Sequence, residues 1–165
     1  MTIEVDEYGL ASTAAFCPLF DLEVTVQLFT DLEDDRVTDA MKARVHDLQA
    51  LGPQHRDQVA TMLHEHAEIC FETTSYGHVH ATRLEDETAT NRAAFGIRTP
   101  DDAFRAARLT TVQIDAEHDS FAYRYLLLVF DVPWEGEHGC GIALRDGTPF
   151  TWGSADLYVG GDEPV

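Results

Sequence analysis

The segment with the most chemically active side chains follows an apolar run and contains an aromatic ring, two carboxylates and an imidazole. It reads Trp-Glu-Gly-Glu-His-Gly over residues 134–139, and Asp131 ends the apolar run just before it. A catalytic interpretation uses Glu137 as a base and His138 as an acid, with Trp134 as a binding platform. Neighbouring side chains of an extended chain point in opposite directions, so this carboxylate and this imidazole are poorly placed as a direct pair.

A structural interpretation suits an extended chain better. Asp131, Glu137 and His138 would hydrogen-bond to backbone groups at the end of the strand, and Trp134 would pack over the end of the sheet. The glycines at 136 and 139 would supply positive φ angles. We favour this interpretation and assign no catalytic residue. The motif residues are Trp134, Glu135, Glu137, His138 and Gly139.

Two histidine pairs have to be considered as metal ligands. His64 and His66 fall in a helical pattern, where side chains two positions apart point about 200° apart. His66 lies on an apolar stripe, so we expect a hydrogen-bonded core histidine there. His78 and His80 would face the same side of an extended segment, which suits a metal, but no third fixed ligand accompanies them. They are weak candidates, and we assign neither a metal nor a cofactor.

Other catalytic classes lack their signature residues. The sequence contains no Gly-x-Ser-x-Gly nucleophile elbow. The glycines after Asp131 lead into a predicted strand and not into the helix that a phosphate-binding loop requires. An enzyme is therefore the less favoured class. The alternative that stays open is a metal-dependent enzyme or sensor with a site made of His78, His80, Glu137 and His138.

The composition carries a second signal, a formal net charge of −19 at pH 7. Thirty carboxylates stand against eleven cations, of which only Lys42 is a lysine. Such a surface repels the phosphates of nucleic acids, so we expect no nucleic-acid partner. It attracts basic proteins and accelerates their encounter through long-range steering. Adaptation to a high-GC genome or to salt would also produce this composition, and that explanation stays open.

We place the expected partner-binding surface on two acidic clusters, within residues 31–35 and 85–87. Carboxylates at the rim of an interface would mainly raise the association rate, while buried aromatic side chains would supply the affinity. The candidate residues are Asp31, Glu33, Asp34, Asp35, Glu85, Asp86 and Glu87.

Nothing in the sequence predicts a membrane-spanning or secretory segment. No apolar run approaches the roughly 20 residues of a membrane helix, and the first residues lack the basic and apolar regions of a signal peptide. The three cysteines, Cys17, Cys70 and Cys140, are widely spaced among apolar neighbours and predict buried free thiols. We therefore expect a cytoplasmic protein with no membrane partner.

The first half of the chain predicts strands followed by helices. Alternating apolar residues over 2–5 and 22–29 predict two strands. Apolar residues at helical spacing predict one helix over 37–48, which Gly52-Pro53 ends, and a second over 54–73. Because their connection is short, we expect these helices to form an antiparallel hairpin that covers one face of a sheet.

The second half predicts a polar loop, a short helix and a β-meander. Residues 77–97 are polar and weakly periodic, so we expect a long loop there. Thr99 followed by Pro100 predicts the start of a short helix. Residues 121–131 predict a long strand, and Asp146-Gly147 predicts a hairpin turn.

The order of these elements indicates one α+β domain over residues 1–165, with a frayed tail over 160–165. We expect an antiparallel β-sheet with the helical hairpin and one short helix packed on one face.

The Trp-x-x-Glu-His-Gly pattern resembles a family of uncharacterised bacterial domains in which a strand ends in this motif and a short β-hairpin follows. The matching residues are Trp134, Glu137, His138 and Gly139, followed by Ile142, Asp146 and Gly147. The likeness extends more loosely over residues 14–160, apart from the polar segment 77–97. Domains of this kind are often associated with immunity proteins of bacterial polymorphic-toxin systems, so the resemblance implies a toxin as the partner.

These observations favour a non-catalytic acidic binding protein. Together with the resemblance, the charge leads us to expect an immunity protein that neutralises a basic bacterial toxin by covering its active site. A third hypothesis is a scaffolding domain whose acidity reflects only genome composition or salt adaptation.

Overall fold

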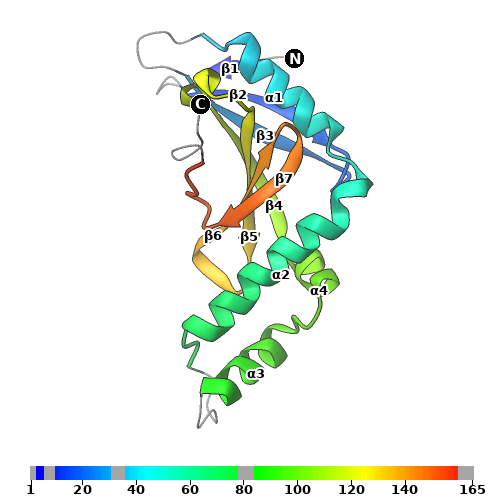
Figure 1. Ribbon diagram of the computed structural model, residues 1–165, viewed down its shortest axis with the longest axis vertical. Helices are drawn as coiled ribbons and strands as arrows, with labels where there is room; N and C mark the ends of the chain where they lie inside the picture. The colour runs from blue at the N-terminus through cyan, green and yellow to red at the C-terminus, as the bar shows by residue number, and fades with distance from the viewer. Residues whose placement is uncertain (1–2, 6–9, 31–35, 78–83, 160–165) are drawn as a thin grey trace.

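A seven-stranded sheet with helices along one side organises the chain (Figure 1). The computed structural model describes residues 3–5, 10–30, 36–77 and 84–159. The strands are β1 (Glu4–Val5), β2 (Ala11–Cys17), β3 (Leu22–Phe29), β4 (Arg108–Asp115), β5 (Tyr125–Val132), β6 (Glu135–Arg145) and β7 (Thr148–Gly153). The α-helices are α1 (Asp39–Ala50), α2 (Arg56–Thr73), α3 (Leu84–Phe95) and α4 (Pro100–Ala106), and the short 3₁₀ helices are η1 (Pro53–His55) and η2 (Ala116–Ser120).

The strands lie side by side in the order of the sequence, from β1 at one edge to β7 at the other. All neighbours pair antiparallel except β3 and β4, which run parallel. The four α-helices lie between these two strands in the sequence and supply the long crossover that a parallel pair needs. The predicted α+β class is confirmed, and the sheet is antiparallel apart from this pair.

The alternation that predicts the strands also decides which face the helices cover. In β3, Val24, Val26 and Leu28 point into the main core, which they share with Met41 of α1 and Leu63 of α2. Fully burying such an aliphatic side chain contributes roughly 1.5–3 kcal/mol. The apolar stripes predicted for the two helices therefore pack against this face of the sheet and form the main core with it.

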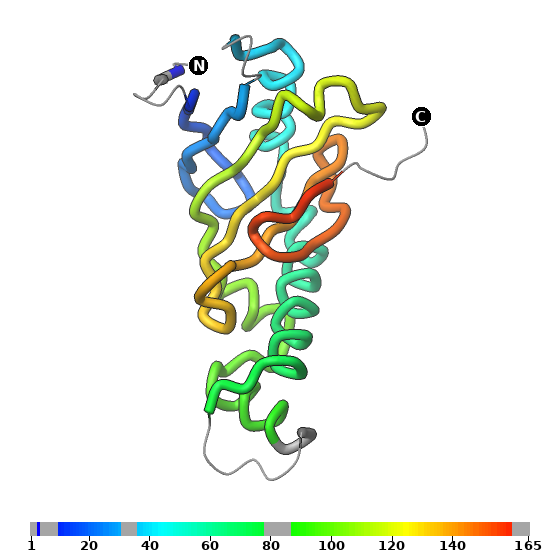
Figure 2. The backbone as a smooth tube through the Cα atoms, turned by 90° about the vertical axis from the view of Figure 1, so that its left-hand side faces the viewer, coloured from blue at the N-terminus to red at the C-terminus, as the bar shows by residue number. Residues whose placement is uncertain are grey.

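The opposite face of the sheet carries a smaller apolar cluster, because β5 is apolar on both faces. Tyr125 and Leu127 point away from the helices and pack with Ala143 of β6 and with Val159. We call residues 154–159 the C-terminal segment, which covers part of this helix-free face. Figure 2 shows the chain turning back over the sheet after β7.

The antiparallel helix pair is not the expected one. α1 packs on β2 and β4, whereas α2 packs on α3, α4, β6 and β7. The cap residue Leu51 and the following Gly52 both have extended backbone angles, so the chain continues into α2 without reversing. Figure 1 shows the two helices following one another down the molecule. The antiparallel neighbour of α2 is α3.

The prediction of a loop over residues 77–97 is wrong, because α3 occupies Leu84–Phe95. Its two most buried residues are polar: Asn91 Nδ2 donates to the carbonyl of Phe71 at 3.1 Å, and Thr88 Oγ1 donates to the same oxygen at 3.4 Å. Arg92 also forms an ion pair with Glu68 of α2. Since polar residues supply these contacts, the helix has little apolar periodicity to detect. The expected tail, residues 160–165, lies outside the described residues.

A buried arginine ties α1 to the turn after β4. Arg44 is 1% exposed, and its guanidinium donates to the backbone carbonyl of Asp115 at 2.9 Å and to Asp119 Oδ1 at 2.5 Å. Thr38 Oγ1 donates to the other oxygen of Asp119 at 2.6 Å. These contacts hold η2 against the start of α1.

Replacing Arg44 with methionine should lower the free energy of unfolding by about 3 kcal/mol, because it leaves the partly buried Asp119 without its cation. Urea denaturation measures this loss. Arg108→Met is the matched control, since Arg108 pairs with Asp131 on an exposed surface and should contribute less than about 1 kcal/mol. Equal losses in the two variants would contradict the role given to the buried pair.

Candidate functional site

The Trp134 motif forms the turn between β5 and β6 and anchors it to α2. Trp134 is 1% exposed, and its Nε1 donates to Nδ1 of His66 at 2.9 Å. The hydroxyl of Tyr76, just beyond the end of α2, donates to the carbonyl of Trp134 at 2.6 Å. The tryptophan thus joins the end of the sheet to the helix through both its ring and its backbone.

His66 is the hydrogen-bonded core histidine that its position on the apolar stripe predicts. Since Nδ1 accepts the indole proton, the neutral ring carries its own proton on Nε2. Burial lowers the pKa of His66, and the negative charge of Glu135 opposes this only in part. The imidazole is therefore neutral at pH 7 and acts as an acceptor inside the core.

Glu135 is the residue that binds backbone groups in this turn. Its Oε1 accepts hydrogen bonds from the amide of Glu137 at 3.1 Å and from the amide of His138 at 3.2 Å. The sequence had led us to expect these hydrogen bonds to backbone groups from Asp131, Glu137 and His138. Instead, Asp131 pairs with Arg108 on the surface, so only the general idea of a carboxylate at this turn matches the structure.

The pair considered for acid–base chemistry points into solvent. The side chains of Glu137 and His138 are 89% and 68% exposed, and Glu137 Oε2 lies 4.0 Å from His138 Nε2. Neither residue lines the pocket described below. Both side chains are therefore open to solvent and outside this pocket.

Two glycines, the last motif residue Gly139 and the nearby Gly141, allow close backbone approaches, the first to β5 and the second to the C-terminal segment where it crosses β6. Gly139 has a φ of +65°, and a Cβ placed there would lie 2.6 Å from the carbonyl oxygen of Phe130. A Cβ on Gly141 would lie 2.5 Å from the carbonyl oxygen of Ser154. Gly136, for which a positive φ was also expected, does not have one.

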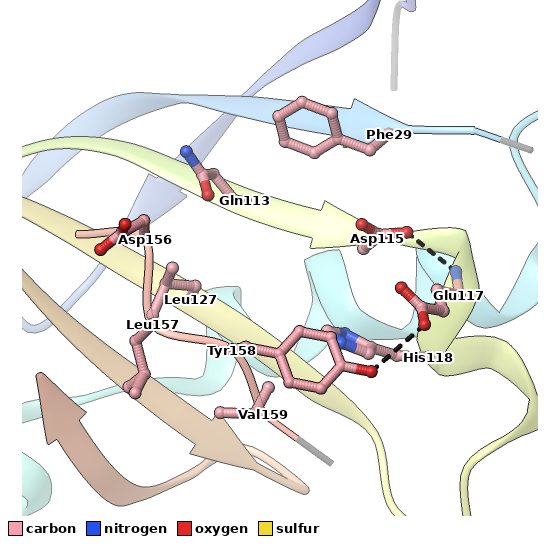
Figure 3. A pocket seen from close by; sticks show the side chains of 10 residues that line it. All are labelled: Phe29, Gln113, Asp115, Glu117, His118, Leu127, Asp156, Leu157, Tyr158 and Val159. Atoms are coloured by element: carbon pink, nitrogen blue, oxygen red, sulfur yellow. Dashed lines mark hydrogen bonds between the residues drawn. The ribbon is translucent and has the colours of Figure 1, made fainter. Parts of the chain in front are cut away.

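The crossing segment forms one wall of a pocket on the helix-free face (Figure 3). The pocket has a volume of about 240 Å³ and lies between the ends of β3 and β4, η2 and the C-terminal segment. In Figure 3, Phe29 and Tyr158 lie on opposite sides of the row formed by Gln113 and Asp115. The lining residues are Phe29, Gln113, Asp115, Glu117, His118, Leu127, Asp156, Leu157, Tyr158 and Val159.

The lining contains three carboxylates and neither lysine nor arginine. Asp115 Oδ1 accepts the amide proton of Glu117 at 2.9 Å, and Glu117 Oε1 accepts the hydroxyl of Tyr158 at 3.2 Å. This hydrogen bond to a carboxylate raises the pKa of Tyr158. Asp156 accepts a hydrogen bond from Ser154. Within the described part of the chain, none of the three carboxylates pairs with a lysine or arginine.

The imidazole of His118, another lining residue, packs among the aromatic rings of Phe121, Tyr125 and Tyr158. Its ring centroid lies 5.1 Å from that of Phe121 and 5.9 Å from that of Tyr125, and Nδ1 is buried without a partner among the described residues. Burial lowers the pKa of His118, and the nearby charge of Arg44 lowers it further against the opposing carboxylates. The ring is therefore neutral at pH 7 and adds no positive charge to the pocket.

Several predicted site residues lie outside the described part of the chain. These are His78 and His80, the weak metal candidates, and the acidic residues Asp31, Glu33, Asp34 and Asp35. The second acidic cluster falls in the first turn of α3, where the side chain of Glu87 is partly exposed and those of Glu85 and Asp86 are not described. Among the described residues, no three His, Cys, Asp or Glu side chains lie close enough to hold a metal ion.

The pocket was not predicted from the sequence. The run Asp-Ala-Glu-His-Asp over residues 115–119 follows a strand, and this clustering of acids with a histidine was a usable signal. Its aromatic wall was not detectable, since Tyr158 is 41 positions from Glu117. None of the described helices is long and apolar enough to cross a membrane.

Comparison with known proteins identifies a family but no activity. The family described as "Domain of unknown function (DUF6985)" matches residues 1–159, so the chain belongs to this family. The searches of curated proteins and of solved structures gave no match.

Stability should fall in acid because of His66. Its pKa in the folded protein lies below the ordinary 6.5, so the unfolded chain binds a proton more readily. Stability is then fully present above pH 6.5 and decreases as the pH falls toward the folded value. His66→Asn keeps an acceptor for Trp134 without the titration, so it should cost less stability at pH 5 than at pH 7.5 in urea denaturation.

His46 provides the control for this measurement, because it lies on the exposed side of α1. The His46→Asn variant should keep the native dependence of stability on pH. If it flattened the profile as much as His66→Asn does, the assignment to the buried histidine would be wrong.

Because the C-terminal segment crosses β6 at close range, we expect two glycine variants in this strand to differ in stability. Gly141→Ala places a Cβ against the carbonyl of Ser154 and should cost about 1–3 kcal/mol of unfolding free energy. Gly136→Ala meets no atom within 4 Å and should change stability by less than about 0.5 kcal/mol. Amide spectra should show the first variant shifting residues 154–159. A wild-type spectrum and stability for Gly141→Ala would refute the constraint.

Proposed function

We propose that this member of a family of unknown function is a non-catalytic, acidic binding protein that captures a basic protein on its helix-free sheet face. The observation that carries the proposal is the pocket on that face, whose three carboxylates pair with no lysine or arginine of the described chain. Carboxylates left unpaired in a concave surface favour a ligand that brings its own positive charge.

Exposed aromatic side chains around the pocket support a protein partner. Phe29 and Tyr158 border it, and Phe150 lies farther along the same face, within 6.4 Å of Tyr125 between ring centroids. Arg145 stacks between Phe150 and Tyr123, with distances of 4.0 Å and 4.8 Å to the two ring centroids. Aromatic residues and arginine are enriched at the centres of protein interfaces, where they contribute most of the affinity.

The net charge of −19 supports a basic partner and fast association. Long-range attraction raises the rate of encounter, while the desolvated contacts at the centre set the lifetime of the complex. The acidic residues of 31–35 and 85–87 would add to this long-range attraction through their charge.

The identity of the partner rests on the resemblance of the Trp134 motif to domains associated with toxin immunity. In this proposal the partner is a basic toxin, and the domain neutralises it in the cytoplasm by covering its active site. No cofactor is needed for such a function, because the protein acts by occupying a surface.

The test is co-expression with the toxin gene adjacent to the gene for this protein, followed by purification and titration in salt. We expect a complex whose dissociation constant rises steeply with salt concentration, because the attraction is between exposed charges. The double variant Asp115→Asn with Glu117→Gln should weaken the complex about tenfold or more.

A matched control changes the same charge on the helical side. Asp57→Asn with Glu72→Gln removes two exposed carboxylates from α2 and should leave the affinity within about a factor of three. The proposal fails if no complex forms, if the affinity is indifferent to salt, or if the two double variants weaken the complex equally.

A further inference from the structure

The size of the pocket suits one side chain. Its volume of about 240 Å³ lies below the roughly 300 Å³ at which sites for small organic ligands usually begin. Leu127, Leu157 and Val159 give it an apolar base, and the carboxylates stand around them. A long basic side chain fits this arrangement, because its methylene groups would contact the apolar base and its charged head group would reach the carboxylates at the rim.

The hydrogen bonds inside the pocket leave acceptors for a ligand. One oxygen of Asp115 and one of Glu117 take part in the contacts within the turn and with Tyr158, and the second oxygen of each has no partner in the described chain. The side chain of Gln113, whose amide carries one acceptor oxygen and an NH₂ donor group, lines the same wall. Several acceptors around a small space favour a head group with several donors.

The aromatic walls distinguish between the two basic side chains. Phe29 and Tyr158 border the pocket from β3 and from the C-terminal segment (Figure 3). A guanidinium is planar, weakly hydrated and able to stack on aromatic rings while it donates in its own plane to carboxylates. An ammonium is a compact and strongly hydrated charge, and it gains less from such walls.

We propose that the pocket is a receptor for a single arginine side chain of the basic partner, with its guanidinium held by Asp115 and Glu117 and bordered by Phe29 and Tyr158. This inference deepens the proposed function and rests on it. Asp156 adds a third negative charge at the rim.

The basic residues close to the pocket would not repel a bound cation. Arg44 lies behind the turn, where its charge is compensated by Asp119 and its donors are directed to the carbonyl of Asp115 and to that carboxylate. His118 is neutral at pH 7, as described above. The charge of Arg44 is therefore already paired with Asp119, whereas the pocket carboxylates pair with no lysine or arginine of the described chain.

The experiment compares two small probes, N-acetyl-arginine amide and N-acetyl-lysine amide, by amide NMR titration of the whole protein at pH 7.5. We expect the arginine probe to shift Gln113, Glu117 and Tyr158 and to bind about three- to fivefold more tightly than the lysine probe. Asp115→Asn with Glu117→Gln should abolish these shifts, whereas Asp57→Asn with Glu72→Gln should leave them unchanged. Tyr158→Leu should remove the preference for arginine over lysine.

Equal affinity for the two probes, shifts confined to other surfaces, or no saturable shift would overturn the inference. These outcomes are separable from a failure of the proposed function. A salt-dependent complex with the basic toxin that forms without any binding of the arginine probe would leave the proposed function standing and refute the arginine pocket. Binding of the probe without a complex would refute the proposed partner instead.

Discussion

The passage of the C-terminal segment over β6 is the constraint on which the helix-free face depends. The carbonyl of Ser154 lies where a side chain on Gly141 would collide with it, and the amide of Ala155 donates to the carbonyl of His138 at 3.2 Å. This approach lets Val159 reach the small apolar cluster and brings Tyr158 to Glu117. Without it, one wall of the pocket would be missing.

The motif turn acts on both faces of the sheet at once. On one side, Trp134 is buried against His66 and holds the sheet to α2. On the other, the carbonyl of His138 accepts the amide proton of Ala155, and Gly141, just after the motif, leaves room for the backbone of Ser154. The side chains of Glu137 and His138 are exposed. The motif therefore positions other parts of the molecule.

The placement of the cations explains why the pocket is negative although the protein contains many ion pairs. Among the described arginines, Arg92 pairs with Glu68, Arg124 with Asp47, and Arg44 with Asp119. Each of these pairs joins two elements of the fold. The three pocket carboxylates pair with no lysine or arginine of the described chain, so the helix-free face keeps their negative charge.

The α+β class, the long helix α2, the capped start of α4 at Thr99 and the hairpin at Asp146-Gly147 are all predictable from the sequence, because each depends on local periodicity or turn chemistry. Helix α3 is not, because its two most buried residues are polar. The closing of the turn by Glu135 and the meeting of distant segments in an acidic, aromatic pocket become visible only in the folded molecule. Contacts such as that of Glu117 with Tyr158 join positions far apart in the chain, and they leave no periodic pattern in the sequence.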